Sequence, residues 1–139
     1  MTGIRGLCEL ACPVSPRLFE AFVDAYIETI WWLKPEDPEW KTDREFGPGV
    51  VEAIVADCLK FWEAGHGIFD RYWTPWQAGH DFWLTRNGHG AGFWDRYLDF
   101  RGDEADEVRR RGDELTEICQ RGWKESDLYL GDDGKAYLE

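Results

Sequence analysis

Residues 15–33 read SPRLFEAFVDAYIETIWWL, and this stretch predicts the clearest helix of the chain. Ser15 is a residue type that caps helix N-termini, and Pro16 suits the first helical position. Apolar side chains then recur every three or four residues, which places them along one face of a helix. They are Phe19, Phe22, Val23, Tyr26, Ile27 and Ile30. Residues 31–33, Trp-Trp-Leu, extend this stripe nearly all round, so we expect this end of the helix to be deeply packed or covered by a partner.

A proline-rich and charged stretch follows this helix. Pro35 and Pro38 are expected to stop the helix, and residues 35–49 are predicted to form a surface loop. Residues 48–64 then return to the helical period, with Gly65 as the expected stop of this second helix.

A third helix is indicated by Thr74 as its N-cap and Pro75 at its first position. Its exit is expected at residues 87–88, Asn-Gly. The alternative is a β-hairpin that pairs residues 82–85 with residues 93–95. The capping residues at both ends favour the helix.

The end of the chain changes from helical to alternating patterns. Residues 103–121 predict the last helix, and residues 128–130 and 135–138 alternate around the turn sequence Gly-Asp-Asp-Gly, which predicts a β-hairpin within residues 123–139. A lone hairpin is barely stable in water, so it must pack on the helices. The fold class predicted is therefore mainly α with a small β component (α+β). We expect residues 1–139 to form a single-domain helical bundle closed by the C-terminal hairpin.

Length and composition are those of a globular protein. The chain has 139 residues, of which 43% are hydrophobic and 16% aromatic, with nine tryptophans. No apolar run approaches the roughly 20 residues that a membrane helix needs, which argues against a membrane-spanning protein. The first residues lack the layout of a secretion signal. We therefore expect a cytoplasmic protein.

The charge balance bears on the kind of partner. With 28 acidic and 16 basic residues the net charge is −12, so direct nucleic-acid binding is not favoured, because such binding depends on Lys and Arg neutralising phosphates. Residues 109–111, Arg-Arg-Arg, form the one basic cluster, but acidic residues surround it, as on an ordinary solvated helix face. The acidity instead suits docking on a protein with a basic surface, or mimicry of nucleic acid. The alternative is simply a soluble acidic protein.

The four cysteines are expected to be reduced thiols. They are Cys8, Cys12, Cys58 and Cys119. A cytoplasmic chain seldom carries disulfides, and the two near the N-terminus lack a second close pair of ligands that a zinc site would need. We therefore expect no bound metal and no cofactor.

The most unusual segment, residues 79–96, reads GHDFWLTRNGHGAGFWDR. It combines two histidines, four aromatic residues and four glycines in eighteen positions. Alternating glycines at its centre allow positive φ and close approach of a ligand or chain, and amides of such a loop can form an anion-binding nest. This predicts a recognition loop. Its candidate binding residues are Arg86, Asn87, Gly88, His89, Gly90, Trp94 and Arg96.

The alternative interpretation of this segment is structural. Its glycines would serve only to turn the chain, and the turn would be held by an Arg86–Asp95 or an Asp81–Arg96 ion pair.

Catalysis has weaker support. His80, Asp81 and His89 are candidates for general acid–base roles, since imidazole and carboxylate groups do this chemistry. Adjacent helical residues point about 100° apart, however, so His80 and Asp81 should not form a dyad with each other. No established catalytic or nucleotide-binding motif is present. The sequence favours a binding protein over an enzyme.

Residues 78–96, together with Gly112–Glu117 and Asp127–Leu138, resemble a family of small proteins encoded by bacteriophages, prophages and related mobile elements. The resemblance covers about the C-terminal 65 residues. It implies a phage-related origin and a bacterial host cytoplasm, and it assigns no chemistry to any residue.

Two functional hypotheses follow. The preferred one is an acidic interaction protein that binds and inhibits a host nucleic-acid-handling or defence protein, with exposed tryptophans as anchors. The alternative is a small-molecule or nucleotide-binding, or catalytic, domain that uses residues 86–92.

Overall fold

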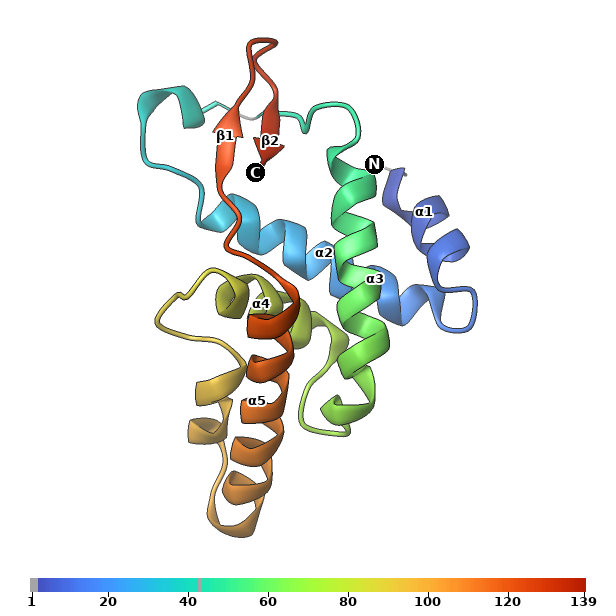
Figure 1. Cartoon of the computed structure of the whole chain (residues 1–139), viewed down its shortest axis with the longest axis vertical. Coiled ribbons are helices and arrows are strands. Elements are labelled where there is room, and N and C mark those ends of the chain that lie inside the picture. The colour runs from blue at the N-terminus through green and yellow to red at the C-terminus, as the bar shows by residue number, and fades with distance from the viewer. Residues whose placement is uncertain (1–2, 43) are drawn as a thin grey trace.

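The computed structural model describes residues 3–42 and 44–139 (Figure 1). The elements in order are α1 (Gly3–Ala11), α2 (Pro16–Trp32), the 3-10 helix η1 (Pro38–Trp40), α3 (Val50–Phe69), α4 (Pro75–Arg86), the 3-10 helix η2 (Phe93–Asp99), α5 (Gly102–Gly122), β1 (Leu128–Leu130) and β2 (Ala136–Leu138). The predicted class, mainly α with a small β component, is confirmed. Residues 1, 2 and 43 of the predicted domain lie outside the described residues. Residue 43 also belongs to the predicted surface loop.

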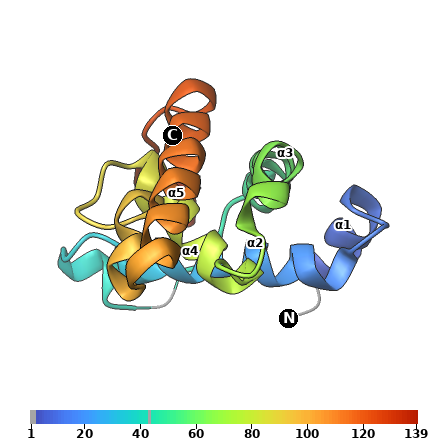
Figure 2. The same cartoon turned by 90° about the horizontal axis from the view of Figure 1, so that it is seen from below.

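Helix α2 is the base on which α1, α3 and α4 pack, while α5 packs on α3, α4 and η2. In Figures 1 and 2 it runs across the molecule, with α1 at its N-terminal end and α3 and α5 rising on one side. Helix α4 crosses α2 closely, because Gly79 brings the two backbones together. A Cβ at this position would collide with the Phe22 carbonyl oxygen and lie 2.8 Å from the Ala25 Cβ.

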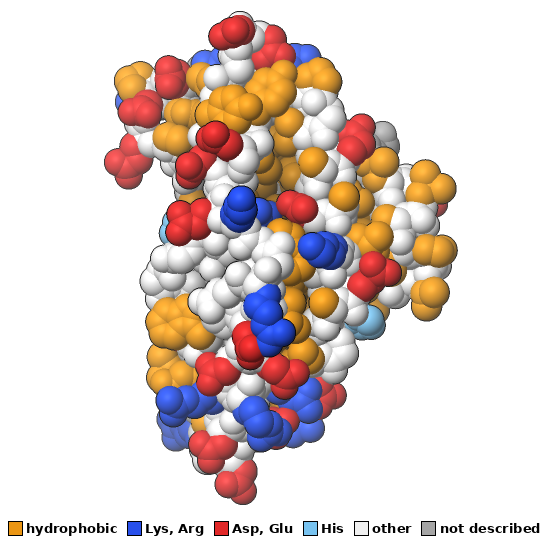
Figure 3. Space-filling view, viewed as in Figure 1, with side chains coloured by type: hydrophobic (Ala, Val, Ile, Leu, Met, Phe, Trp, Pro, Cys, Tyr) orange, Lys and Arg blue, Asp and Glu red, His pale blue; other side chains and the backbone are white. Residues whose placement is uncertain are grey.

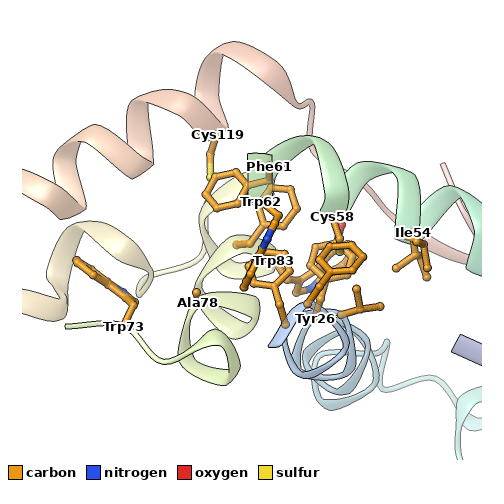
Figure 4. Close-up of a cluster of buried hydrophobic side chains, with 14 of the residues drawn as sticks. Tyr26, Ile54, Cys58, Phe61, Trp62, Trp73, Ala78, Trp83 and Cys119 are labelled. Carbon is orange, nitrogen blue, oxygen red and sulfur yellow. The ribbon is translucent and has the colours of Figure 1, made fainter. Parts of the chain in front are cut away.

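A column of stacked aromatic rings fills the core between these helices. The Phe61 ring of α3 lies 4.3 Å from that of Phe82, 5.5 Å from that of Phe93 and 6.0 Å from that of Phe22, measured between centroids. Such contacts add to the free energy gained from burying the rings. Figure 4 shows part of this cluster, where Cys119 of α5 points toward Phe61. The predicted apolar face of α2 is thus used as expected.

Helix α4 forms where the rival hairpin was considered. The Thr74 hydroxyl accepts a hydrogen bond from the Gln77 amide at 3.0 Å, which caps the helix as predicted. Ser15 occupies the N-cap of α2, but its side chain makes no capping hydrogen bond.

The predicted stop of α3 at Gly65 is wrong. The helix continues to Phe69, and Gly65 lies inside it, facing α5. A Cβ there would lie 3.0 Å from the Leu115 Cδ2, so this glycine provides close packing between the two helices. Helices α1 and η2 were not predicted.

The C-terminal hairpin forms with Leu128 opposite Leu138 and Leu130 opposite Ala136. It also joins the segment before α3, because the Ala136 amide donates to the Glu45 carbonyl at 2.7 Å and its carbonyl accepts from the Gly47 amide at 2.8 Å. In the described part of the predicted surface loop, residues 35–42 and 44–49, the chain therefore makes more structured contacts than expected. It contains η1, whose Trp40 is buried.

Over the two described ranges, every helix is too short or too polar to span a membrane.

Candidate functional site

The loop after α4 starts with a helix C-cap. The Gly88 amide donates to the Thr85 carbonyl at 3.3 Å, and the His89 amide donates to the Leu84 carbonyl at 3.1 Å. This is the Schellman pattern, which requires a left-handed residue after the helix, and Gly88 supplies it with φ +66°. Gly90, by contrast, is exposed, and a Cβ on it would have no neighbour within 4 Å.

The buried Asp81 and the half-buried Arg96 form an ion pair that ties α4 to η2. The Arg96 guanidinium donates to both Asp81 oxygens, at 2.6 and 3.2 Å. Trp73 and Gln77 donate to the same carboxylate at 3.0 and 3.3 Å. Burial raises the pKa of Asp81, and the bonds from Arg96, Trp73 and Gln77 oppose that rise. With its side chain fully buried and four donors on it, Asp81 is a structural group rather than a catalytic one.

Arg86 is also used within the chain. Its guanidinium donates to the Tyr26 hydroxyl at 2.9 Å, to Asp57 at 3.1 Å and to the Lys124 carbonyl at 2.8 and 3.0 Å. Of the two ion pairs considered for the structural turn, the Asp81–Arg96 pair is present, whereas Arg86 pairs with Asp57 and not with Asp95. Asp95 instead accepts a hydrogen bond from the Gly92 amide at 3.1 Å.

These bonds weaken the idea of an anion-binding nest. The amides of Gly88, His89 and Gly92 and the guanidinium groups of Arg86 and Arg96 all have acceptors inside the chain. A phosphate would have to compete with these acceptors for the donors that were expected to bind it.

Asn87 and His89 border a hollow of about 270 Å³, which we call the His89 hollow. It lies between the ends of α2 and α4 and residues 125–128, which lead into β1. Its apolar wall includes Ile30, Leu33 and Trp83. Its polar rim includes Asn87, His89, Glu125 and Asp127.

The polar groups of this hollow differ in availability. The Asn87 side chain is used internally, because its oxygen accepts from the Ser126 amide at 2.7 Å and its nitrogen donates to the Trp83 carbonyl at 3.0 Å. His89, Glu125 and Asp127 are exposed. Asn87 therefore shapes the hollow, and the other three can contact a ligand.

His80 lies apart from the hollow's rim, on the face of α4 that packs on α2. Its Nδ1 is hydrogen-bonded to the Thr29 hydroxyl, and its Nε2 lies 3.8 Å from a Glu28 oxygen. Burial lowers the pKa of His80, while the charges of Glu28 and Asp81 oppose this and that of Arg96 adds to it. His80 and Asp81 have separate partners, as expected for neighbours on a helix.

The predicted binding residues thus do not form one site in the structure. Asn87 and His89 share the hollow, and a Cβ on Gly88 would lie 3.7 Å from Glu125. Arg86 and Arg96 face inward, whereas Trp94 on η2 is 42% exposed.

Sequence reasoning missed Glu125 and Asp127, because they lie outside any motif between α5 and the hairpin. It also placed Trp32 in a packed or partner-covered end of α2. The structure leaves Trp32 67% and Leu33 45% exposed.

The surface carries intermixed charges rather than a basic field. At the end of the molecule where α5 begins, Figure 3 shows blue and red groups side by side. There Arg110 and Arg111 pair with Glu107, and Arg111 also approaches Asp70 at 3.7 Å. Two of the three arginines of the basic cluster are therefore paired as on a solvated helix face, and the third, Arg109, lies over the Tyr97 ring.

Within residues 3–42 and 44–139, no group of three or more His, Cys, Asp or Glu side chains is placed to hold a metal ion. Cys8, Cys58 and Cys119 are buried and Cys12 is half-buried, all four as free thiols. Comparison with known protein families, with characterised proteins and with solved structures gave no match to this chain.

Proposed function

We propose that this chain is a phage- or mobile-element-related acidic interaction protein of the bacterial cytoplasm. It binds, and by binding inhibits, a host protein that handles nucleic acid or acts in defence. The observation that carries the proposal is the His89 hollow, where an apolar wall is combined with the exposed carboxylates of Glu125 and Asp127. On a chain with a net charge of −12, such a site suits a basic protein surface.

The same observations argue against the alternative, a domain that binds a phosphorylated small molecule through residues 86–92. Arg86 is engaged by Tyr26, Asp57 and Lys124. The charged side chains that line the hollow are those of Glu125 and Asp127, which repel phosphate.

The test is affinity purification of the tagged protein from its bacterial host, followed by binding measurements with the captured partner. We expect a partner with a basic surface, whose affinity falls as salt is raised. His89→Ala should weaken binding about tenfold, or about 1.4 kcal/mol, and leave the melting temperature nearly unchanged, because His89 is exposed. Asp127→Asn should weaken binding and reduce the salt dependence.

Asp132→Asn is the matched control, because it removes the same charge at the exposed tip of the hairpin. It should bind as the unmodified chain does. If the folded His89→Ala variant binds the partner with unchanged affinity, the loop is a structural turn and not a recognition element. A gain in thermal stability from a panel of nucleotides, without a protein partner, would favour the small-molecule alternative.

A further inference from the structure

Two hydrogen-bond acceptors face each other where α4 packs on α2. The Thr29 hydroxyl donates its own proton to the Ala25 carbonyl at 2.7 Å, so in its bond with His80 it must accept. The neutral imidazole therefore carries its proton on Nδ1 and a lone pair on Nε2. This lone pair lies 3.8 Å from a carboxylate oxygen of Glu28.

This pair of acceptors lacks a donor. Burial lowers the pKa of His80, which favours the neutral imidazole at neutral pH. Among the described residues, Glu28 forms no ion pair with Lys or Arg. His80 Nε2 makes no hydrogen bond with the described residues, and the His80 side chain is 11% exposed. Among those residues Trp83 Nε1 is the one fully buried side-chain nitrogen or oxygen without a partner, so His80 Nε2 keeps contact with solvent. A donor from outside can reach both acceptors.

Two exposed tryptophans flank the imidazole. The Trp32 ring stacks on His80 at 4.9 Å and 24°, and the Trp76 ring meets it at 5.0 Å and 77°. Trp32 is 67% and Trp76 41% exposed. Glu28 and Trp32 lie one helical turn apart on α2, so the carboxylate and the indole ring are neighbours on one face of that helix.

We propose that Glu28, His80 and Trp32 form a binding site for an arginine side chain of a partner protein. The guanidinium donates one N–H to the Glu28 carboxylate and a second to His80 Nε2, so its plane lies close to that of the imidazole, where it can pack against the same face of Trp32 that covers His80. This inference rests on the proposed function in that a basic protein supplies the arginine, but it concerns a different site from the His89 hollow.

The chemistry selects arginine among the possible ligands. The parallel N–H bonds of a guanidinium reach two acceptors that lie side by side, whereas the N–H bonds of a single ammonium nitrogen diverge. Arginine also stacks on indole rings. An anion would be repelled by Glu28 and would face the lone pair of His80.

The surrounding charge favours a cation as well. Glu20, Asp24 and Glu28 follow each other at single-turn spacing along α2. Burial, and then the charge of Glu20, raise the pKa of Asp24, and Glu28 adds to this while Arg5 opposes it. A guanidinium bound at Glu28 would relieve part of this repulsion.

The test is NMR on the ¹⁵N-labelled full chain, titrated with the peptide acetyl-Gly-Arg-Gly-amide. The control peptide carries citrulline, a neutral isostere of arginine. We expect the arginine peptide to shift the His80 Nε2 and Trp32 indole signals in a saturable way, and the citrulline peptide to bind at least tenfold more weakly. A lysine peptide should also bind more weakly than the arginine peptide.

Variants assign the effect to the site. Glu28→Gln should weaken binding of the arginine peptide about tenfold, and Trp32→Ala should weaken it several-fold. Glu114→Gln, which makes the same charge change on α5, and Tyr129→Ala, which removes another exposed aromatic ring, should bind as the unmodified chain does. Trp32 is mostly exposed, so its variant is expected to fold, which the melting temperature checks.

Equal binding of the arginine and citrulline peptides, equal binding of the lysine peptide, or unchanged binding in Glu28→Gln would each overturn the arginine site. None of these results affects the proposed function, which is tested by His89→Ala and the salt dependence of the captured complex. Conversely, saturable arginine binding with no basic partner captured would support the site and contradict that function.

Discussion

His80 and Asp81 are neighbours in sequence with different chemical surroundings. One step along a helix turns the side chain by about 100°. His80 consequently faces α2 and solvent, while Asp81 faces the interior and Arg96. The sequence pattern made both candidates for acid–base chemistry, and the packing of α4 assigns Asp81 to stability instead.

Replacing Asp81 tests this assignment. Asp81→Asn keeps the shape of the side chain but leaves the half-buried Arg96 without its main counter-charge. We expect the free energy of unfolding to fall by about 2 kcal/mol, measured by urea denaturation. Asp99→Asn is the control, because Asp99 pairs with the same guanidinium at 3.3 Å but its side chain is 64% exposed. Its effect should stay within about 0.5 kcal/mol, and equal losses in both variants would contradict a structural role specific to Asp81.

The cysteines differ in reactivity for a related reason. Burial, with the nearby charges of Glu20 and Asp24, raises the pKa of Cys8 to about 12, and burial also raises the pKa of Cys58 and Cys119. The thiolate is the reactive form of cysteine, so these three thiols should be inert in the folded chain.

Labelling with iodoacetamide at about pH 8 checks this, with modified positions read by peptide mass spectrometry. We expect Cys12, which is half-buried, to react first in the native protein. In urea all four cysteines should react. Rapid native labelling of Cys8 would show that this thiol is not protected as the structure indicates.

At the scale of elements, the crossing of α2 and α4 determines where the candidate sites lie. It brings Thr29 to His80 and Leu33 to Asn87 across the interface. Gly79 permits this close approach, and no local signal distinguishes it from the other glycines of its segment.

Gly79→Ala should therefore be strongly destabilising. The added methyl group meets the Phe22 carbonyl and the Ala25 Cβ, which belong to the backbone and core of α2 and cannot move aside. We expect a loss of about 3 kcal/mol or more in thermal or urea unfolding.

Gly67→Ala on α3 provides the matched control for this substitution. Its added methyl group meets nothing within 4 Å, and Gly67 is an exposed helical position. That variant should be more stable by up to about 1 kcal/mol, because alanine favours helix. Similar stability of the two variants would show that the crossing can open at little cost.

At the scale of the whole molecule, the excess of carboxylates affects stability as well as binding. The net charge of −12 includes the row of Glu20, Asp24 and Glu28 on α2, where like charges lie one turn apart. Such self-repulsion destabilises the compact state and is screened by salt.

The melting temperature should accordingly rise by a few degrees between about 10 mM and about 200 mM NaCl. Asp24→Asn should raise the melting temperature at low salt and reduce its increase with salt, because it removes the middle charge of the row. A melting temperature that falls with salt would mean that favourable ion pairs outweigh the repulsion.

Much of the architecture was determined by the sequence alone. The apolar period of α2, the Thr-Pro start of α4 and the turn residues of the hairpin are local signals, and each predicted its element. Local signals did not predict the length of α3, because Gly65 serves packing against Leu115 rather than a helix end. They also did not predict η1, η2 or the burial of Trp40, which depend on contacts with distant segments.

In the candidate functional site, too, some features were predicted from the sequence and others were not. Residues 79–96 could be singled out by composition, and their ion pairing through Asp81 and Arg96 was among the alternatives considered. Only the tertiary structure decided that Arg86 faces inward to Asp57, that Glu125 and Asp127 lie beside His89, and that Trp32 covers His80. The physical reason is that periodicity and capping are properties of neighbours along the chain, whereas the partner of a buried charge or an exposed ring is chosen by how helices cross.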